Sequence, residues 1–296
     1  MQEALKLLRR VPRNQVILLD GFLVGAGDPD GFAQVAAPLV GVVHHPLCLE
    51  AGLSPDRAAF LRENERNMLA GLAHVIVTSP HTAGLLNRDF DVPIEKITIA
   101  TPGFTRPETS PSPITPPLIL SVGLLAERKG HDVLLNALAR IMDLPWQARI
   151  VGKVFDPDVH RSLLAQSLAL GLAHRVEFAG ELSDRALQAE FSAASVFALA
   201  TRYEGYGMAL NEAMQYDLPV VSCDTGAVSE TVGGAGLLVP VDDAEGFASA
   251  LRALLTDHAL RTRQQAESRA RAQSLPSWDE TARTVTDLIR RLRINM

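Results

Sequence analysis

Two glutamates, Glu204 and Glu212, are separated by seven residues that include the run Gly205-Tyr206-Gly207. A helical pattern opens near Met208, directly after this glycine-rich turn. A turn of this kind before a helix presents backbone N–H groups and the positive end of the helix dipole, which together favour an anion. The two carboxylates beside that spot can accept hydrogen bonds from hydroxyl groups. The combination suits a diphosphate joined to a sugar, that is, a nucleotide-sugar.

Two cations, Arg128 and Lys129, follow the apolar run Leu118–Val122, and Gly130 marks a turn after them. Cations in this position can neutralise a diphosphate leaving group. An isolated Arg-Lys pair is more often a solvated loop. The position of this pair, at one of several apolar runs that end in polar residues, favours the functional interpretation.

Two neighbouring histidines, His44 and His45, follow the apolar run Leu39–Val43. A lone histidine is more often structural than catalytic, although its side chain can donate, accept or transfer a proton near neutral pH. We keep both residues as candidates because they stand directly at the end of a predicted strand.

Three other motifs have simpler explanations. Asp28-Pro29-Asp30 and Asp156-Pro157-Asp158 match the D-x-D pattern of metal-dependent transferases, but the central proline favours a turn or helix start. The run Gly25-Ala26-Gly27 lacks the third glycine of a nicotinamide-binding fingerprint, because Asp30 occupies its place. We therefore predict no metal site and no cofactor.

The residues after position 117 predict strands that alternate with helices. The predicted strands are Leu118–Val122, Ala148–Val151, Val176–Phe178, Val196–Ala200, Val220–Ser222 and Leu237–Val239, and helical patterns cover Asp132–Ile141, Val159–Leu170 and Asp184–Ala194. Short apolar strands that alternate with helices are typical of a parallel sheet covered on both faces. Ligands of such sheets bind outside the carboxyl ends of the strands, where the Glu204 loop and the Arg128-Lys129 pair are expected.

The first part of the chain has a similar, shorter pattern. The predicted strands are Val16–Leu19, Leu39–Val43, Val75–Thr78 and Ile97–Ala100, with helix starts at Ser54-Pro55 and Ser79-Pro80. We predict a first domain over residues 1–104, a proline-rich linker over 105–117, a second domain over 118–275 and a last helix over 276–296. Five prolines between Pro107 and Pro117 exclude helix and central strand from that linker.

The bulk composition limits the classes of protein. Hydrophobic residues make up 47% of the 296 residues, so a large core can form. A net charge of −6 argues against nucleic-acid binding, which needs a basic face. The two cysteines, Cys48 and Cys223, form no metal or disulfide pattern, and no apolar run is long enough to span a membrane. We predict a cytoplasmic protein; the basic start, Met1 to Arg13, could touch a membrane surface, but a solvated first helix is favoured.

Several of these segments together resemble one family over the whole second domain, in order. The segments are Gly123 through Leu135, Glu204 to Glu212, Leu218-Pro219-Val220-Val221 and Gly226 to Val232. They are similar to the retaining GT-B glycosyltransferases of the glycosyltransferase 4 type (glycosyl transferases group 1). The resemblance implies an α/β fold in which two Rossmann-like domains, each with a parallel sheet, face a central cleft, and a last helix that packs back toward the first domain.

The resemblance also implies roles for individual residues. Glu204 would contact the hydroxyls of the donor sugar and Glu212 the ribose of the nucleotide. Lys129 would grip the diphosphate. Backbone groups around Gly123 and from Gly205 through Tyr206 and Gly207 to Met208 would support the sugar or the phosphates. His44, with His45 as the near alternative, would lie close to the donor sugar and the acceptor.

The chain departs from the family pattern in two places. Leu124 occupies the position at which the family often has an arginine, so one diphosphate contact is missing unless Arg128 supplies it. The family's first domain usually begins with a strand and a glycine-rich loop, which nothing before Val16 supplies. We therefore expect a first domain that is short or incomplete.

The expected function is transfer of a hexose from a nucleoside-diphosphate sugar to an acceptor hydroxyl, with retention at the anomeric carbon and without a metal. A non-catalytic nucleotide-sugar-binding or partner subunit is the alternative, and a GT-B-like phosphorylase or sugar-nucleotide epimerase is a weaker one. The base, the sugar and the oligomeric state stay open, as does the acceptor, which could be a glycan, a lipid or a small molecule.

Overall fold

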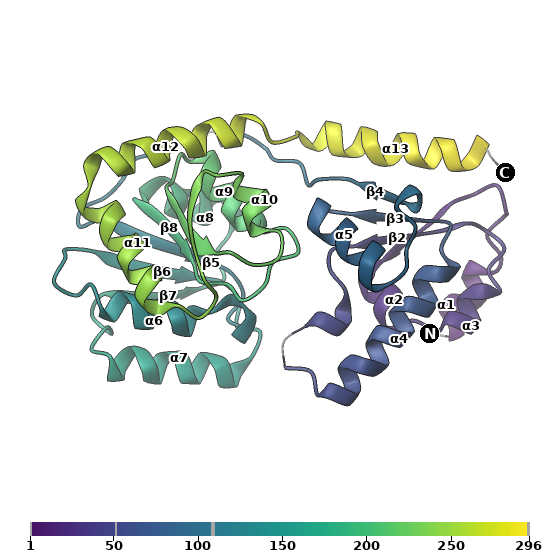
Figure 1. Cartoon of the computed structure of the whole chain (residues 1–296), viewed down its shortest axis with the longest axis horizontal. Coiled ribbons are helices and arrows are strands. Elements are labelled where there is room, and N and C mark those ends of the chain that lie inside the picture. Colours follow the sequence, from purple (N-terminus) through teal and green to yellow (C-terminus); the bar gives the residue numbers. More distant parts are fainter. Residues whose placement is uncertain (1, 51, 108–109, 295–296) are drawn as a thin grey trace. The chain divides into compact units, whose positions relative to one another are not determined.

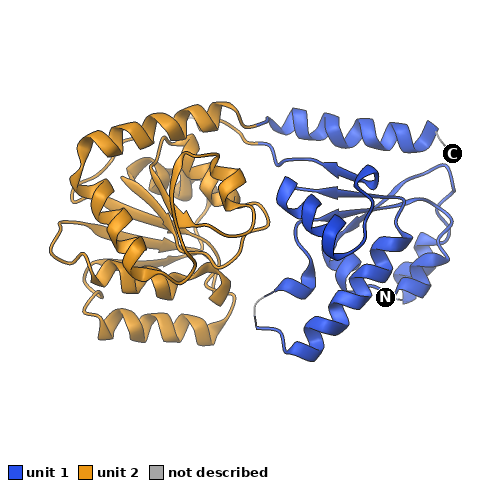
Figure 2. Ribbon diagram, in the orientation of Figure 1, with its two compact units in different colours: residues 1–103, 276–296 blue, residues 104–275 orange. Residues whose placement is uncertain are grey.

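The chain folds into two compact α/β units. A computed structural model describes residues 2–50, 52–107 and 110–294. Unit 1 comprises residues 1–103 and 276–296, and unit 2 comprises residues 104–275 (Figure 2). Residues 1 and 51, residues 108–109 of the expected linker and residues 295–296 of the expected last helix lie outside the described residues.

Unit 1 is built on a parallel sheet of four described strands in the order β1-β2-β3-β4 (Figure 1). The strands are β1 (Ile17–Asp20), β2 (Leu39–Val43), β3 (His74–Val77) and β4 (Ile97–Ile99). The helices between them are α1 (Gln2–Leu8), α2 (Gly21–Ala26), α3 (Pro29–Ala33), α4 (Pro55–Gly71) and α5 (Pro80–Asp89), with short 3₁₀ turns η1 (Leu47–Leu49) and η2 (Ile94–Lys96). The serines that precede α4 and α5 cap these helices as the sequence predicts: Ser54 accepts from the Arg57 N–H and Ser79 from the Thr82 N–H.

Alternate residues of the unit 1 strands pack on opposite faces of the sheet. Val75 and Val77 join a core formed with the helices α1 to α5. Ile76, which points the other way because side chains alternate along a strand, packs with Leu288 of α13 (Trp278–Ile294). The last helix of the chain thus covers the second face of the first sheet (Figure 1).

Unit 2 contains a parallel sheet of six described strands in the order β10-β9-β8-β5-β6-β7. Its strands are β5 (Leu118–Val122), β6 (Gln147–Val151), β7 (Val176–Gly180), β8 (Val196–Leu199), β9 (Val220–Cys223) and β10 (Gly236–Val239). The strand order reverses between β5 and β8. The connections that leave these two neighbouring strands run to opposite faces of the sheet. Doubly wound sheets bind ligands outside the carboxyl ends of strands at such a reversal.

Helices cover both faces of this second sheet. They are α6 (His131–Ala139), α7 (Pro157–Ala169), α8 (Asp184–Ala193), α9 (Met208–Gln215), α10 (Val228–Val232), α11 (Ala244–Thr256) and α12 (His258–Gln273), with the 3₁₀ turn η3 (Glu127–Lys129). Ile119 packs in the core with α6, α7 and α11, whereas Leu118 and Leu120 pack with α8, α9 and α10. These findings confirm the α/β class with parallel sheets.

The segment before β5 runs without helix or strand over its described residues. Its backbone binds unit 2, since the Ser112 N–H donates to the Ser192 oxygen at 2.7 Å and the Ile114 N–H to the Ala193 oxygen at 3.1 Å. These contacts explain why the segment over 105–117, expected as a linker, groups with unit 2.

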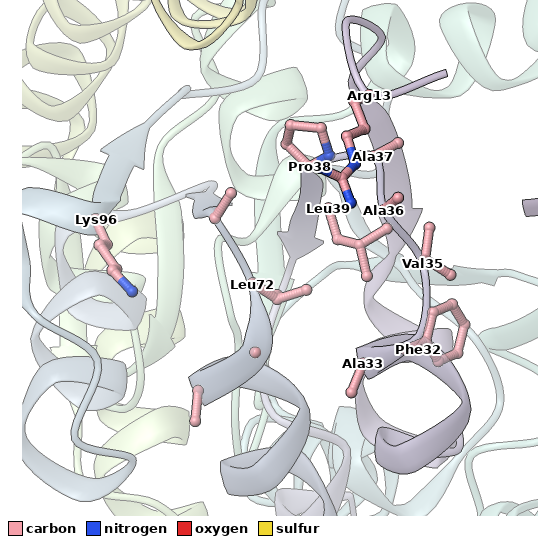
Figure 3. A pocket seen from close by; sticks show the side chains of 13 residues that line it. Arg13, Phe32, Ala33, Val35, Ala36, Ala37, Pro38, Leu39, Leu72 and Lys96 are labelled. Carbon is pink, nitrogen blue, oxygen red and sulfur yellow. The ribbon is translucent and has the colours of Figure 1, made fainter. Parts of the chain in front are cut away.

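A cavity of about 530 Å³ opens in unit 1 at the amino ends of the strands (Figure 3). Apolar residues that precede β2 and β3 line it, and Arg13 and Lys96 contribute the two cations. The predicted site residues do not line this cavity, because they follow the carboxyl ends of the strands.

Candidate functional site

The loops after β5 and β8 bring a lysine and a glutamate into direct contact. The Nζ atom of Lys129 lies 2.6 Å from Oε1 of Glu204, and the two side chains are only 13% and 7% exposed. These loops leave the neighbouring strands at which the sheet order reverses. The pair therefore stands where a doubly wound sheet binds its ligand.

Gly130 sets the position of Lys129. Its φ of 62° is left-handed, and a Cβ atom at this residue would lie 1.9 Å from the Ala200 oxygen. Only glycine tolerates both conditions at low cost. The backbone at the end of η3 can therefore lie in close contact with the backbone at the end of β8. Gly123, at the end of β5, lies against the stem of Lys129, because its Cβ would be 3.2 Å from the lysine Cδ.

Arg128 is the second cation at Glu204. Its Nη1 donates to the Tyr203 oxygen at 2.9 Å and lies 3.8 Å from Oε2 of Glu204. The family position that often holds an arginine carries Leu124, whose side chain is 39% exposed. Glu204 therefore has a cation near each of its two oxygens, and both cations come from η3.

The segment after β9 supports the backbone of Glu204. The Ala227 N–H donates to the Glu204 oxygen at 2.9 Å. A Cβ at Gly226 would lie 2.2 Å from that same oxygen, and the residue has a φ of 55°. The glycine of the Gly226 to Val232 segment thus permits a close approach of two backbones.

The glycine-rich turn leads into α9 as the sequence predicts. Gly207 has a left-handed φ of 95° and precedes Met208, the first residue of α9. Tyr206 accepts a hydrogen bond at its hydroxyl from Nδ2 of Asn211 at 2.7 Å, and its backbone oxygen accepts from the Thr231 hydroxyl. Burial raises the pKa of Tyr206 to about 12, so the phenol is neutral at physiological pH.

Glu212 lies on α9 with its side chain partly buried. Burial raises the pKa of its carboxyl above the usual value, and the charge of Asp184 raises it further. Among residues 2–50, 52–107 and 110–294, no hydrogen-bond donor or cation is paired with this carboxylate. A partly buried acid without a protein partner is suited to accept hydrogen bonds from a ligand.

The two histidine candidates belong to unit 1. His44 is exposed directly after β2, and Nε2 of His45 lies 2.7 Å from Oε1 of Glu50. The buried Glu65 of α4 fixes the segment that follows, because it accepts from the Leu47 and Cys48 N–H groups at 2.5 and 3.0 Å. Both histidines therefore stand at the carboxyl end of a parallel strand, as predicted.

The sequence interpretation did not single out two residues that hold the site together. Thr201 donates from its hydroxyl to the Arg128 and Tyr203 oxygens, each at 3.1 Å. The guanidinium of Arg202 bonds Asp132 and Asp242. Their place, directly before Tyr203-Glu204, is the only sequence signal that could have pointed to them.

The two D-x-D segments occupy helix starts. Asp156 caps α7 through the Asp158 and Val159 N–H groups, and Asp28 precedes α3. Over the described ranges, the structure brings no three His, Cys, Asp or Glu side chains together in a way that could hold a metal ion. The helices in these ranges are also too short or too polar to cross a membrane.

Comparison with known proteins places this site in context. Residues 116–257 match the family model described as "Glycosyl transferases group 1". A D-inositol 3-phosphate glycosyltransferase from Xylanimonas cellulosilytica is 29% identical over 246 residues, which cover 76% of this chain and 58% of that protein. The matched regions span roughly half the length of the first curated relatives, at 43%, 58% and 44%.

Solved structures share the fold over nearly the whole chain. A sucrose-phosphate synthase from Thermosynechococcus elongatus superposes with a TM-score of 0.84 at 26% identity, covering 95% of this chain and 74% of that one. Anabaena HepE, solved with UDP and glucose, superposes with a TM-score of 0.82 at 19% identity, covering 98% and 80%. The two units thus form a GT-B fold of two Rossmann-like domains.

Proposed function

We propose that the protein transfers a hexose from a nucleoside-diphosphate sugar to an acceptor hydroxyl, on the premise that residues 116–257 match the glycosyl transferases group 1 family model. We further propose that the anomeric configuration is retained and that no metal takes part. The observation that carries the proposal is the contact between Lys129 and Glu204 at the reversal point of the second sheet.

The positive charges at this point can stabilise a diphosphate as it departs from the donor sugar. Lys129 and Arg128 supply positive charge, and the start of α9 adds the positive end of a helix dipole. Lysine carries three N–H donors, so Lys129 can keep its bond to Glu204 and still bind a phosphate oxygen. A pair that is already assembled needs little reorganisation when charge develops on the leaving group.

Glu204 and Glu212 have separate roles in this proposal. Glu204 accepts hydrogen bonds from hydroxyls of the donor sugar and Glu212 from hydroxyls of the ribose. The lack of a protein partner for Glu212 within the described residues supports its role. His44, or His45 in its place, contacts the sugar or the acceptor hydroxyl.

The proposed reaction breaks the bond between the anomeric carbon and the diphosphate oxygen and forms a bond from that carbon to the acceptor oxygen. The acceptor attacks from the face that the diphosphate leaves, which retains the configuration. The departing phosphate oxygen takes the acceptor's proton. The cations stabilise the negative charge that grows on the diphosphate in the transition state.

The first experiment is a thermal-shift screen with UDP, GDP and ADP and their hexose conjugates. A ligand that binds only the folded state raises the melting temperature, by an amount that grows with concentration over Kd. We expect the ligands that contain one of the three nucleotide bases to raise the melting temperature more than the others do. Transfer is then assayed with that donor and a panel of acceptors, which includes inositol phosphates because one relative is named for such an acceptor.

The outcomes of this screen separate the proposal from its alternatives. Binding without transfer or donor hydrolysis would favour a non-catalytic nucleotide-sugar-binding subunit, to which Leu124 at a frequent arginine position would then be relevant. Phosphate-dependent cleavage would indicate a phosphorylase, and isomerised sugar without acceptor an epimerase. No binding to any nucleotide would contradict the proposal.

A further inference from the structure

Arg202 joins three segments at the carboxyl edge of the second sheet. Its Nη1 donates to the Glu127 oxygen at 2.6 Å and to Oδ1 of Asp132 at 3.0 Å, while Nη2 donates to Oδ2 of Asp132 at 2.7 Å. Its Nε donates to Oδ1 of Asp242 at 2.8 Å, and its backbone N–H donates to the Arg128 oxygen at 2.8 Å. One residue therefore binds η3, the start of α6 and the segment after β10.

These hydrogen bonds involve residues that lie close in sequence to Lys129 or to Glu204. Glu127 and Arg128, whose oxygens accept from Arg202, are the two residues before Lys129. Arg202 itself stands two residues before Glu204. The Thr225 hydroxyl donates to the Arg202 oxygen at 2.9 Å and so ties this residue to the segment after β9. A shift of Arg202 would move the backbone on both sides of the pair.

The two aspartates hold the guanidinium in a fixed orientation. Asp132 accepts two bonds from it in a forked arrangement, and Asp242 accepts a third from Nε. The Arg202 side chain is 25% exposed. The hydrogen bond to Asp132 and then the charges of both aspartates raise the pKa of Arg202. Lysine has one point of charge and cannot reproduce this planar fork.

We propose that Arg202 is a positioning residue for catalysis, which holds η3 against the loop after β8 so that Lys129 and Glu204 meet at the diphosphate. The inference rests on the proposed function. Arg202 acts through Lys129, since its guanidinium is occupied by the two aspartates and by the Glu127 oxygen.

The kinetic experiment compares Arg202→Met with Arg252→Met. Arg252 is the matched control because it also forms a bidentate pair, with Asp143 at 2.7 and 2.6 Å, but Asp143 lies before β6 at the opposite edge of the sheet. We expect Arg202→Met to lower kcat by about tenfold to a hundredfold, as misplacement of a catalytic group by about 1 Å does. Arg252→Met should change kcat by less than about twofold, and Arg202→Lys should restore only part of the loss.

A double-mutant cycle distinguishes positioning from general stabilisation. If Arg202 acts through Lys129, Arg202→Met should cost less than about twofold once Lys129→Ala is present. A residue that only stabilises the fold would lower the activity of both backgrounds by the same factor. Should Arg202→Met fail to fold, Asp242→Asn tests the same contact: asparagine suits the left-handed φ of 62° at this position, and a loss in the same direction is expected.

A second measurement reports the position of Lys129 by NMR and does not depend on sugar transfer. The chain contains only Lys6, Lys96, Lys129 and Lys153 as lysines, so ¹³C-methylated lysine side chains give few NMR signals. The Lys129 signal, assigned by its loss in Lys129→Ala, should move in Arg202→Met and stay in place in Arg252→Met. An unmoved signal together with unchanged kcat would overturn the positioning role. A moved signal in a protein that binds no nucleotide and transfers no sugar would overturn the proposed function and leave the positioning of Lys129 standing.

Discussion

At the residue scale, the site pairs groups that would be costly to bury alone. Glu204 is almost fully buried and is satisfied by Lys129 and by the nearby Arg128. A buried carboxylate without such partners would lose several kcal/mol of solvation, of order 3 to 5 kcal/mol when one partner of a buried pair is removed. The geometry thus couples the carboxylate expected at the sugar to the ammonium group expected at the diphosphate.

Burial, and then the charge of Asp184, raise the pKa of the Glu212 carboxyl. Because folding raises this pKa, the native state binds the proton more tightly than the unfolded state does. Glu212 therefore destabilises the native state at neutral pH, and this effect is relieved as the pH falls through its folded pKa. The ionised carboxylate is a stronger acceptor for ligand hydroxyls than the protonated acid, so nucleotide affinity should fall over the same range.

Glu212→Gln tests both effects. We expect greater stability at neutral pH by chemical denaturation, together with nucleotide affinity that is about tenfold weaker from the loss of a charged hydrogen bond. Calorimetric affinity in wild type should decline as the pH is lowered from neutral toward the ordinary pKa of a glutamate, whereas the variant should show a flatter profile. Equal affinity in the two proteins at neutral pH would rule out the ribose contact.

At the element scale, glycines permit the contacts between the loops. Gly130 and Gly226 both have left-handed φ angles and both would place a Cβ against a backbone oxygen of a neighbouring loop. The strands and helices bring these loops to one edge, but the glycines determine how closely they approach.

Gly226→Ala should destabilise the protein more than Gly171→Ala does. Gly171 also has a left-handed φ, of 70°, but a Cβ there meets nothing within 4 Å, so it reports the strain of the backbone alone. We expect an additional cost of about 1 to 3 kcal/mol for Gly226→Ala, measured as the difference in free energy of unfolding, because the clash is with backbone. Equal costs would show that the segment after β9 moves freely away from Glu204.

The sequence predicted the elements better than the contacts between them. Every predicted strand appears within one or two residues of its expected bounds, for example β5 at Leu118–Val122 and β1 at Ile17–Asp20 instead of Val16–Leu19. Apolar periodicity and proline caps are local signals and were sufficient for this. The bonds of Arg202 to Asp132 and Asp242 join residues that are 70 and 40 positions apart, and no local pattern encodes them.

At the scale of the whole molecule, the chain crosses between its units and then returns. Residues 276–296 group with unit 1, where Leu288 is 2% exposed in the second face of the first sheet. The Thr281 hydroxyl donates to the Thr101 oxygen at 2.7 Å and fixes the start of α13 there. The last helix is therefore part of the folded core of unit 1.

Leu288→Ala should loosen this helix. We expect a loss of about 2 to 5 kcal/mol, the range for large-to-small core substitutions, and faster amide hydrogen exchange in α13 and β3. Leu168→Ala is the control, because Leu168 on α7 is 71% exposed. Unchanged exchange in α13 would mean that its contact with the first sheet contributes little.

The central claim is that Lys129 stabilises a leaving diphosphate without help from a metal. The most direct test is the turnover of the preferred nucleotide-sugar by wild type and by Lys129→Ala, each with and without EDTA. We predict that Lys129→Ala lowers kcat by about a hundredfold or more and that EDTA leaves the wild-type rate intact. Equal turnover by the two proteins, or inhibition by EDTA that manganese reverses, would contradict it.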